Sequence, residues 1–400
     1  MTAQSEIFDC VVVGGGPSGA TAADDLARAG RTVALLDRAG RIKPCGGAIP
    51  PRCIADFAIP PDLLVARIRS ARMVSPKRRD VDMPIDGGFV GMVDREHFDE
   101  WLRERAARSG ASRLAGTFED LARDPDGTAV IRYRPKGAPS GTVAEVRARS
   151  VIGADGARSA LAKAEVKGGD SVKCVFAYHE IVRSPAPAAD DSFDPARCDV
   201  HYRGVVSPDF YGWIFPHGDT TSVGTGSARK GFALRDAVGR LRADVGLGGA
   251  ETLRREGAPI PMKPLKRWDN GRDLVLAGDA AGVVAPASGE GIYYAMLGGR
   301  LAADAVAEFL ETGRSKALAG ARRRFMKEHG QVFFILGLMQ AVWYRSDGMR
   351  ERFVKLCRDP DVQRLTWDSY MNKRIKRSDP MAHLRVFFKD MAHLLRLATP

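Results

Sequence analysis

The sequence lacks the marks of a disulfide-stabilised, secreted or membrane-spanning protein. Its 400 residues include only six cysteines, none of them in a CxxC pair, so a reducing compartment is expected. The longest apolar run, VFFILGLMQAVW at 332–343, is well short of the roughly 18 residues that span a bilayer. The first residues also lack the basic segment and apolar core of a secretory signal. We therefore expect an intracellular protein without a transmembrane helix.

Positive charge is concentrated towards the C-terminus. The chain has a net charge of +12, and residues 321–400 hold 17 Lys and Arg against 8 Asp and Glu. This asymmetry favours a polyanionic partner, either anionic lipid or nucleic acid. Large apolar residues such as Trp343, Phe387 and Phe388 lie among these charges, which favours a membrane surface. The alternative is a helical cap that packs on the rest of the fold.

The hydrophobic fraction of 44% supports a chain of two or three packed domains. Residues 8–38 have the pattern of a strand, a glycine turn, an amphipathic helix and a second strand ending at Asp37, which predicts a βαβ unit. The pattern further predicts short strands within 69–92, a helix over 94–110, a hairpin over 128–153, strands within 174–227, a helix over 232–245, a strand near 273–278 and helices from 290 nearly to the end.

The first motif, GGGPSG, follows the apolar strand FDCVVV and opens a helix. Gly14, Gly16 and Gly19 fit the GxGxxG pattern, whose glycines permit a tight turn, close approach to a pyrophosphate and close packing of helix on strand. Asp37 ends the next strand, where a carboxylate can bond ribose hydroxyls. This context predicts a dinucleotide-binding turn rather than an ordinary glycine turn.

Two later motifs each follow a short apolar strand. VIGADG, residues 151–156, ends in Asp155 and Gly156 and by itself is more typical of a simple turn. The segment DLVLAGDAAGVVAPASGEGIYYAM contains Gly278 and Asp279 and leads to a helix at Gly291. An aspartate in that place can bond a polyol chain, and helix N–H groups can face a negatively charged ring edge.

Together, and in this order, the three motifs resemble the two-dinucleotide-binding-motif flavoproteins of the p-hydroxybenzoate hydroxylase fold. The resemblance implies that the first motif holds the ADP part of FAD, that the Asp-Gly motif lies near the flavin and that the late Gly-Asp motif contacts the ribityl chain. Arg95 occupies the place of an arginine that helps to hold FAD, although an exposed arginine at a helix start is the alternative. The residues implied for FAD are Gly14, Gly16, Pro17, Ser18, Gly19, Asp37, Arg38, Cys45, Gly46, Arg95, Asp155, Gly156, Gly278, Asp279, Gly289 and Gly291.

Two further segments are similar to the geranylgeranyl reductase family. PDFYGWIFP, residues 208–216, matches its P-x-x-Y-x-W-x-F-P pattern, and KPCGG matches the cysteine loop that these enzymes place beside the flavin. The alternatives are core aromatics and a cysteine that acts as a small buried hydrophobe. The C-terminal RDPDVQRLTWDSYMNKRIKRSDPMAHLRVFFKDMAHLL and the segment ASGEGIYYAM most resemble the branch that reduces the tails of chlorophylls and bacteriochlorophylls. The resemblance implies catalysis by Cys45, Tyr211 and Trp213, and a prenyl site formed by Gly46, Gly47, Tyr211, Trp213, Phe215 and Pro216.

The resemblance also implies an architecture, which is an α/β and α+β fold with a Rossmann-like FAD-binding domain, a β-sheet substrate domain and a helical C-terminal region. The FAD-binding domain would comprise residues 1–70, 93–165 and 270–310. The prenyl-binding domain would comprise 71–92 and 166–269, and the basic helical region 311–400. Peripheral attachment to the cytoplasmic side of a photosynthetic membrane is expected, with no nucleic-acid partner and no metal site.

The implied reaction is reduction of isolated C=C bonds of a geranylgeranyl chain to phytyl, on geranylgeranyl bacteriochlorophyll, with NADPH as the electron donor. No second βαβ fingerprint for a nicotinamide nucleotide is visible, which fits transient binding at the surface. The alternatives are a monooxygenase or halogenase of the same fold, a non-catalytic prenyl or pigment carrier, and a reductase acting on the free diphosphate or on a membrane lipid.

An isolated trisubstituted alkene is a poor hydride acceptor, because no carbonyl stabilises the developing charge. Protonation of the other alkene carbon would give it carbocation character, which each aromatic face stabilises by roughly 0.5 to 2 kcal/mol. Two such contacts are a small part of a catalytic barrier, so positioning of the alkene is expected to matter more. Cys45 is then a proton donor, a group that positions the alkene, or an inert loop residue. Positioning with assistance to proton transfer is the expectation.

Overall fold

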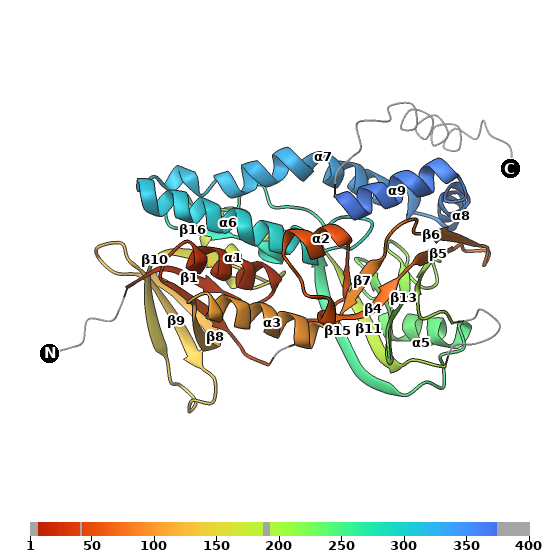
Figure 1. The fold of residues 1–400 in the computed structure, drawn as a ribbon, viewed down its shortest axis with the longest axis horizontal. Helices are drawn as coiled ribbons and strands as arrows, with labels where there is room; N and C mark the ends of the chain where they lie inside the picture. The colour runs from red at the N-terminus through yellow and green to blue at the C-terminus, as the bar shows by residue number, and fades with distance from the viewer. Residues whose placement is uncertain (1–6, 41, 187–192, 374–400) are drawn as a thin grey trace. The chain divides into compact units, whose positions relative to one another are not determined.

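The structure is a computed structural model that describes residues 7–40, 42–186 and 193–373. The chain forms two compact units, and Figure 1 labels their elements. Unit 1 comprises Met1–Lys43, Arg95–Cys174 and Pro259–Phe333, and unit 2 comprises Pro44–Asp94, Val175–Ala258 and Phe334–Pro400. Each of the two units is therefore discontinuous in sequence.

Unit 1 contains the βαβ unit that the sequence predicts. Strand β1 (Ile7–Val13), helix α1 (Pro17–Arg28) and strand β2 (Val33–Asp37) follow one another. Residues 10–13 of β1 are at most 2% exposed, as expected for an apolar strand of a parallel sheet that is covered on both faces. The expected βαβ unit is confirmed.

The six-stranded sheet of unit 1 combines parallel and antiparallel pairing. β2 pairs in parallel with the start of β8 (Ser112–Arg123), whose later part pairs antiparallel with β9 (Ala129–Pro135). β9 and β10 (Ala144–Gly153) form the predicted hairpin, and the end of β10 runs parallel to β1 and to β16 (Leu274–Leu276). The long strands β8 and β10 thus belong to both the parallel and the antiparallel part.

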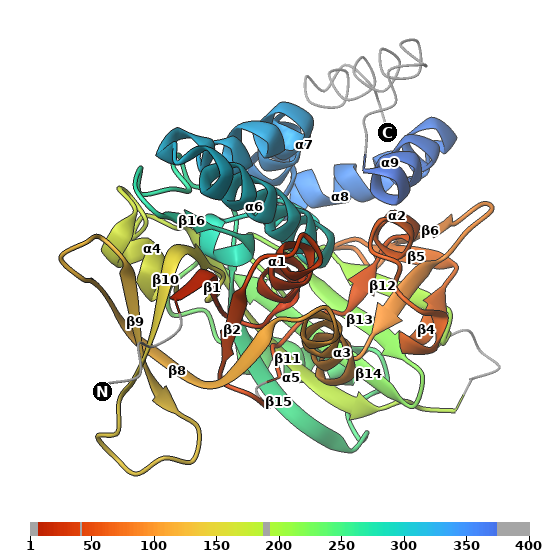
Figure 2. The same cartoon turned by 60° about the vertical axis from the view of Figure 1, so that its left-hand side comes forward.

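Helices cover this sheet. α1 packs against α3 (Arg95–Arg108) and α6 (Ile292–Thr312), as Figure 2 shows. The α1–α6 contact is close because α6 carries glycine there: an ideal β-carbon on Gly299 would lie 2.1 Å from the carbonyl oxygen of Ser18. The shorter elements are α4 (Ala160–Glu165), η2 (Gly278–Ala281) and η3 (Ser315–Ala317).

Unit 2 is built on a seven-stranded sheet of order β15-β11-β14-β13-β12-β5-β6. Helix α5 (Leu234–Asp244) packs on one face of the sheet, where Ile214, Val223 and Leu241 belong to a fully buried cluster. The strands are β5 (Ser70–Val74), β6 (Asp80–Pro84), β11 (Cys174–Arg183), β12 (Arg197–His201), β13 (Gly212–His217), β14 (Thr220–Ser227) and β15 (Thr252–Pro261).

A small second sheet explains why residues 44–70 belong to unit 2, although the sequence suggested the FAD-binding domain for them. β3 (Ala48–Ile49) and β4 (Leu64–Ile68) both pair antiparallel with β7 (Val90–Val93). These long-range pairings tie the cysteine loop to the second unit. Helix α2 (Pro51–Asp56) and the turn η1 (Pro61–Leu63) lie between β3 and β4.

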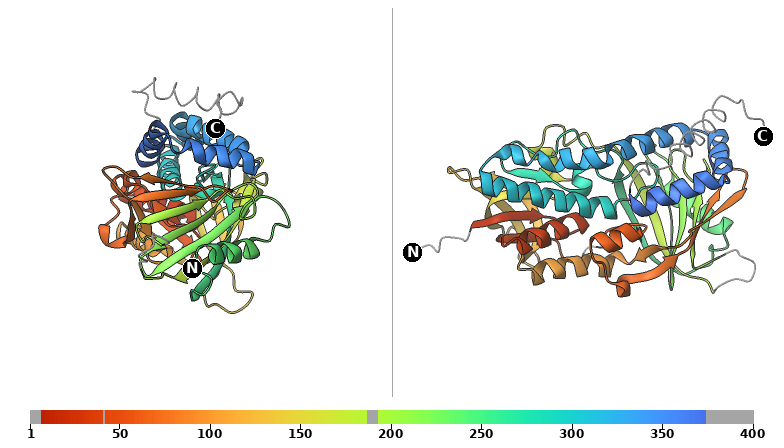
Figure 3. Two further views of the ribbon diagram at one scale, coloured as in Figure 1. Left: turned by 90° about the vertical axis from the view of Figure 1, so that its right-hand side faces the viewer. Right: turned by 45° about the horizontal axis from the view of Figure 1, so that its top comes forward.

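The C-terminal part of the described chain is helical, as predicted. α7 (Gly320–Trp343) is followed by α8 (Asp347–Leu356) and α9 (Pro360–Asn372), which can be traced in Figure 3. Asp359 caps α9 by accepting a bond from the N–H of Asp361 at 2.9 Å. Within the described ranges, no helix is both long and apolar enough to span a bilayer. The basic segment 374–400 lies outside the described residues.

Candidate functional site

The three glycine-containing motifs converge at one edge of the unit 1 sheet. β1, β10 and β16 run in parallel, with Val13 opposite Gly153 and Gly153 opposite Leu276. Gly14, Asp155 and Gly278 follow these residues by one or two positions, so the three motifs lie at the carboxyl ends of neighbouring strands. That edge is where open α/β sheets bind their ligands.

The motifs touch each other as well as sharing an edge. Gly14 has a φ of +107°, and an ideal β-carbon on it would lie 2.2 Å from the carbonyl oxygen of Ala154 in the second motif. Gly278 of the third motif has a φ of +63°, and its β-carbon would lie 2.4 Å from Ser18 Oγ in the first. Glycine is therefore required at both contacts, and the motifs form a single site.

The amino end of α1 is open to a ligand. Gly16 is the N-cap residue, no side chain caps the helix, and an ideal β-carbon on Gly16 would meet no atom within 4 Å. Free N–H groups and the helix dipole favour an anion at such a place. The first turn also carries Pro17, Ser18 and Gly19, and an ideal β-carbon on Gly19 would lie 1.8 Å from the carbonyl oxygen of Gly14.

Asp37 lies beside this turn with both carboxylate oxygens oriented by backbone groups. Its Oδ2 accepts a bond from the N–H of Gly15 and its Oδ1 from the N–H of Ala39, each at 2.9 Å. A carboxylate has about four acceptor positions, so capacity for ribose hydroxyls remains. Arg103, which the sequence did not single out, donates to the carbonyl oxygen of Gly15 at 3.2 Å. Arg38 is exposed.

Arg95 and Asp155 have well-defined partners within the protein. Arg95 is 5% exposed and pairs with Asp99 at 2.8 and 2.7 Å, so the alternative of an exposed arginine at the helix start is wrong. Asp155 accepts bonds from Ser159 Oγ at 2.5 Å and from the N–H of Ala160 at 2.7 Å, which stabilises the start of α4. Burial raises the pKa of Asp155.

Asp279 is held by a lysine that the sequence pattern did not assign. Asp279 is 7% exposed, and its Oδ2 lies 2.5 Å from Nζ of Lys43, so the buried carboxylate has a compensating charge. Beyond it, Gly289 has a φ of +67° and Gly291 is the N-cap residue of α6. Lys43 is a functional candidate whose only sequence signal was its place at the start of KPCGG.

These observations fit the binding of FAD in unit 1. The uncapped start of α1 suits a pyrophosphate, the carboxylate of Asp37 suits a ribose, and the paired carboxylate of Asp279 suits a polyol chain. The glycines at the meeting points of the motifs leave no room for side chains, as a closely approached cofactor requires.

The cysteine loop packs on the aromatic strand within unit 2. An ideal β-carbon on Gly46 would lie 3.0 Å from the ring of Phe215, and one on Gly47 would lie 2.6 Å from Nε2 of His217. The N–H of Gly47 points to Cys45 Sγ at 3.5 Å, and Cys45 is a free, partly exposed thiol. Two segments that the sequence matched independently are therefore in contact.

Three aromatic residues, Tyr211 just before β13 and Trp213 and Phe215 within it, form a row on one face of the sheet. Side chains alternate along a strand, so Tyr211, Trp213 and Phe215 lie opposite Ile214, which packs towards α5. Adjacent rings in the row have centroids 6.1 and 6.2 Å apart. Pro216, expected in the prenyl site, falls on the Ile214 side by the same alternation. Burial raises the pKa of Tyr211, and nearby Tyr344 and Cys45 add to this effect.

Trp213 has polar and steric support that the sequence did not reveal. Its Nε1 donates to Ser222 Oγ at 3.0 Å, which lies 2.9 Å from His179 Nδ1, and His179 Nε2 lies 3.1 Å from Glu256 Oε2. An ideal β-carbon on Gly224 would lie only 2.2 Å from the indole ring. These residues come from the neighbouring strands β11, β14 and β15.

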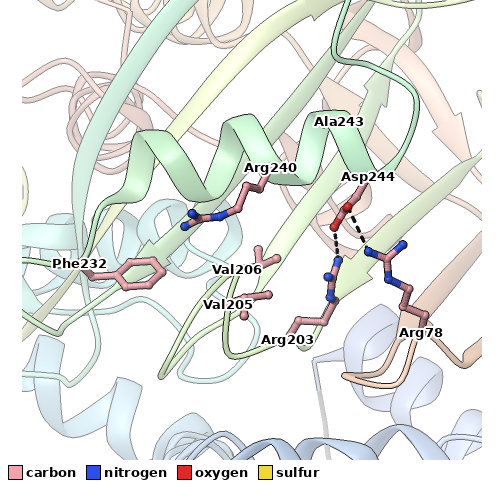
Figure 4. A pocket seen from close by; sticks show the side chains of 8 residues that line it. All are labelled: Arg78, Arg203, Val205, Val206, Phe232, Arg240, Ala243 and Asp244. Atoms are coloured by element: carbon pink, nitrogen blue, oxygen red, sulfur yellow. Dashed lines mark hydrogen bonds and ion pairs between the residues drawn. The ribbon is translucent and has the colours of Figure 1, made fainter.

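A separate depression in unit 2 is lined by three arginines, as Figure 4 shows. Asp244 accepts bonds there from Arg203 at 2.6 Å and Arg78 at 3.1 Å, and the bond from Arg203 lowers the pKa of Asp244. Because two of the guanidinium groups already share a carboxylate, their attraction for an external anion is reduced. We assign no role to this depression.

Solved structures with the same fold define the class of protein. A geranylgeranyl bacteriochlorophyll reductase-like protein from Thermoplasma acidophilum superposes with a TM-score of 0.80 at 20% identity, over 94% of this chain and 99% of that one. A flavin-dependent brominase superposes with a TM-score of 0.72 at 17% identity, over 96% and 100%. The chain thus has the fold shared by FAD-dependent reductases and halogenases, which confirms the predicted fold class.

Sequence similarity narrows the class. A family model described as lycopene cyclase protein matches residues 9–394. A geranylgeranyl diphosphate reductase from Rhodobacter capsulatus is 57% identical over 393 residues, which cover 98% of this chain and 99% of that protein. The chain therefore belongs to the geranylgeranyl diphosphate reductase family of oxidoreductases, and the resemblance drawn from its motifs is confirmed.

Proposed function

We propose that this protein reduces isolated C=C bonds of a geranylgeranyl chain to the phytyl level, with FAD as its cofactor and NADPH as its electron donor. The observation that carries the proposal is the contact between the cysteine loop and the aromatic row, through Gly46 and Phe215, in a chain of this family. A thiol and a row of neighbouring aromatic rings suit an apolar alkene that must be held without water.

In this proposal unit 1 is the FAD-binding domain. The N–H groups that follow Gly16 meet the pyrophosphate, and Asp37 bonds the ribose. When bound and reduced, FAD supplies the hydride that the alkene requires. The remaining groups of unit 1 proposed to hold it are Arg38, Arg95, Asp155, Gly156, Gly278, Asp279, Gly289 and Gly291.

Unit 2 is proposed as the prenyl-binding domain. Tyr211 and Trp213 are 8% and 6% exposed, so the aromatic row lies in surroundings that exclude water. Their faces stabilise positive charge on an alkene carbon during its protonation by roughly 0.5 to 2 kcal/mol each. Cys45 positions the alkene and assists the transfer of the proton. The raised pKa of Tyr211 keeps its hydroxyl protonated.

The proposed substrate is geranylgeranyl bacteriochlorophyll, with the free diphosphate and prenyl lipids as alternatives for the head group. Purified protein would be incubated anaerobically with NADPH and each substrate, and the products analysed by mass spectrometry. We expect successive loss of double bonds, with partly reduced intermediates, on the pigment. NADPH consumption that requires oxygen and leaves every alkene intact would instead indicate a monooxygenase or halogenase.

Peripheral attachment to a membrane surface is part of the proposal. In α7, Phe334, Ile335 and Leu338 are 72%, 39% and 56% exposed, and they lie at helical spacing on one side. Exposed apolar side chains followed by basic sequence suit an anionic lipid surface, where a prenylated pigment resides.

A further inference from the structure

We propose that Ser222, His179 and Glu256 form a positioning network that holds the indole of Trp213 in one orientation and thereby fixes how the prenyl chain lies on the aromatic row. The effect on the prenyl chain rests on the proposed function. The network itself rests only on hydrogen bonds and packing. None of these three residues touches the substrate in this proposal.

The chemistry of the end groups, an indole N–H and a carboxylate, fixes the direction of the two outer bonds. An indole N–H can only donate, so Ser222 Oγ accepts from Trp213 at 3.0 Å. The same oxygen lies within hydrogen-bonding distance of His179 Nδ1, at 2.9 Å. A carboxylate can only accept, so His179 Nε2 donates to Glu256 Oε2 at 3.1 Å. The bond from His179 in turn lowers the pKa of Glu256.

This direction excludes a role as a proton route to the alkene. A proton relay needs a terminal group that can release and regain a proton, and an indole N–H does neither near neutral pH. The network ends in that N–H, so its effect on the site is orientation. The side chain of Glu256 is 15% exposed, whereas that of His179 is 4% exposed. A partly solvated carboxylate therefore holds the buried imidazole.

Packing fixes the same orientation independently. Register places Gly224 between Trp213 and His179 on adjacent strands, and an ideal β-carbon on Gly224 would lie 2.2 Å from the indole and 2.6 Å from the β-carbon of His179. Gly224 does not have a positive φ, so the glycine provides space and not backbone freedom. The indole occupies that space, with its N–H directed to Ser222.

Loss of the network would allow Trp213 to take a second orientation. Ser222→Ala removes the acceptor of the indole and the hydroxyl that bonds His179 Nδ1, so the preference for one indole orientation weakens. A small misplacement of reacting groups can cost up to about 100-fold in rate. We expect the prenyl chain to dissociate before all of its target double bonds are reduced, so partly reduced products should accumulate.

The experiment is fluorine NMR of protein labelled with 5-fluorotryptophan, in which Trp213→Phe assigns the resonance of Trp213. We expect one sharp resonance in the unaltered protein and a shifted or doubled resonance in Ser222→Ala. The matched control is Ser227→Ala on the same strand, whose hydroxyl bonds Asp209 at 2.6 Å and not Trp213. In parallel, the ratio of partly to fully reduced product should rise about 10-fold in Ser222→Ala only.

A second pair of variants keeps the test decisive if Ser222→Ala folds poorly. His179→Gln retains a donor and an acceptor, whereas His179→Phe retains neither, so only the latter should disturb the Trp213 resonance. An unchanged resonance in both Ser222→Ala and His179→Phe would overturn the network. If no prenyl chain is reduced by the unaltered protein, the proposed function fails while the NMR result still decides the network.

Discussion

The role of Cys45 can be resolved at the level of one atom. Cys45→Ala removes the thiol, and Cys45→Ser keeps a smaller group that can still donate a proton. If the thiol positions the alkene, both variants should lose roughly 10- to 100-fold in kcat with FAD content unchanged, measured by single-turnover reduction and by flavin absorbance. Recovery of activity in the serine variant alone would exclude the thiol as the proton donor, because an alcohol is a far weaker acid than a thiol. Full turnover in both variants would remove Cys45 from the mechanism.

His201 predicts a loss of stability in acid. Burial lowers its pKa from 6.5 to about 4, nearby Arg203 adds to this effect and Asp244 opposes it. A depressed histidine pKa means that the unfolded chain binds the proton first. Stability is therefore full above about pH 6.5 and falls by about 3 kcal/mol as the pH approaches 4.

This prediction can be measured by urea unfolding between pH 4 and 7. Neither ring nitrogen of His201 has a hydrogen-bond partner among the described residues, so His201→Leu should flatten the pH dependence at little cost near neutral pH. His97 is exposed, and His97→Gln serves as the control. A pH dependence that is unaltered in His201→Leu would assign the effect to another group.

At the scale of elements, the local sequence pattern was sufficient to predict structure where the paired strands are close together in the sequence. The βαβ unit and the hairpin of β9 and β10 were predicted because alternation, glycine turns and short connections define them. Residues 44–70 were expected in the FAD-binding domain, whereas they belong to unit 2. Their place depends on the pairing of β3 and β4 with β7, which no local pattern encodes.

The residues of the candidate site also fall into two groups, those that a local motif predicts and those that only the folded structure reveals. Gly14, Gly278 and the aromatic row were visible because each lies within a short motif. Lys43 and Ser222 were not, because their roles arise from contacts with Asp279 and Trp213. Ser222 is close to Trp213 in sequence, but only the register of β13 and β14 brings its hydroxyl to the indole.

The contact between α1 and α6 gives a prediction about the cofactor site. Gly299→Ala would place a methyl group 2.1 Å from the carbonyl oxygen of Ser18, so the helices must separate and the turn that carries the first motif must shift. We expect loss of bound FAD, measured as the flavin-to-protein absorbance ratio, together with a lower melting temperature. Gly298→Ala is the control, because the nearest atom to its β-carbon is 3.4 Å away. Full FAD retention in Gly299→Ala would show that the two helices adjust freely.

At the scale of the whole molecule, the excess of basic residues in 321–400 has two explanations that a deletion separates. If the basic sequence attaches the protein to a membrane, removal of residues 374–400 should abolish co-sedimentation with anionic vesicles while FAD remains bound. Each basic residue near an anionic surface contributes about 1 kcal/mol, and binding of the full chain should weaken with added salt because the attraction is screened.

The exposed apolar residues of α7 allow the apolar contribution to membrane binding to be tested separately from the charges. Phe334→Ser with Leu338→Ser should weaken vesicle binding at high salt more than at low salt, because apolar insertion is not screened by ions. Vesicles of neutral lipid serve as the control, because they offer a membrane surface without net charge. If the deletion instead releases FAD and lowers the melting temperature, and the full chain ignores vesicles of both kinds, the basic segment is a cap on the fold.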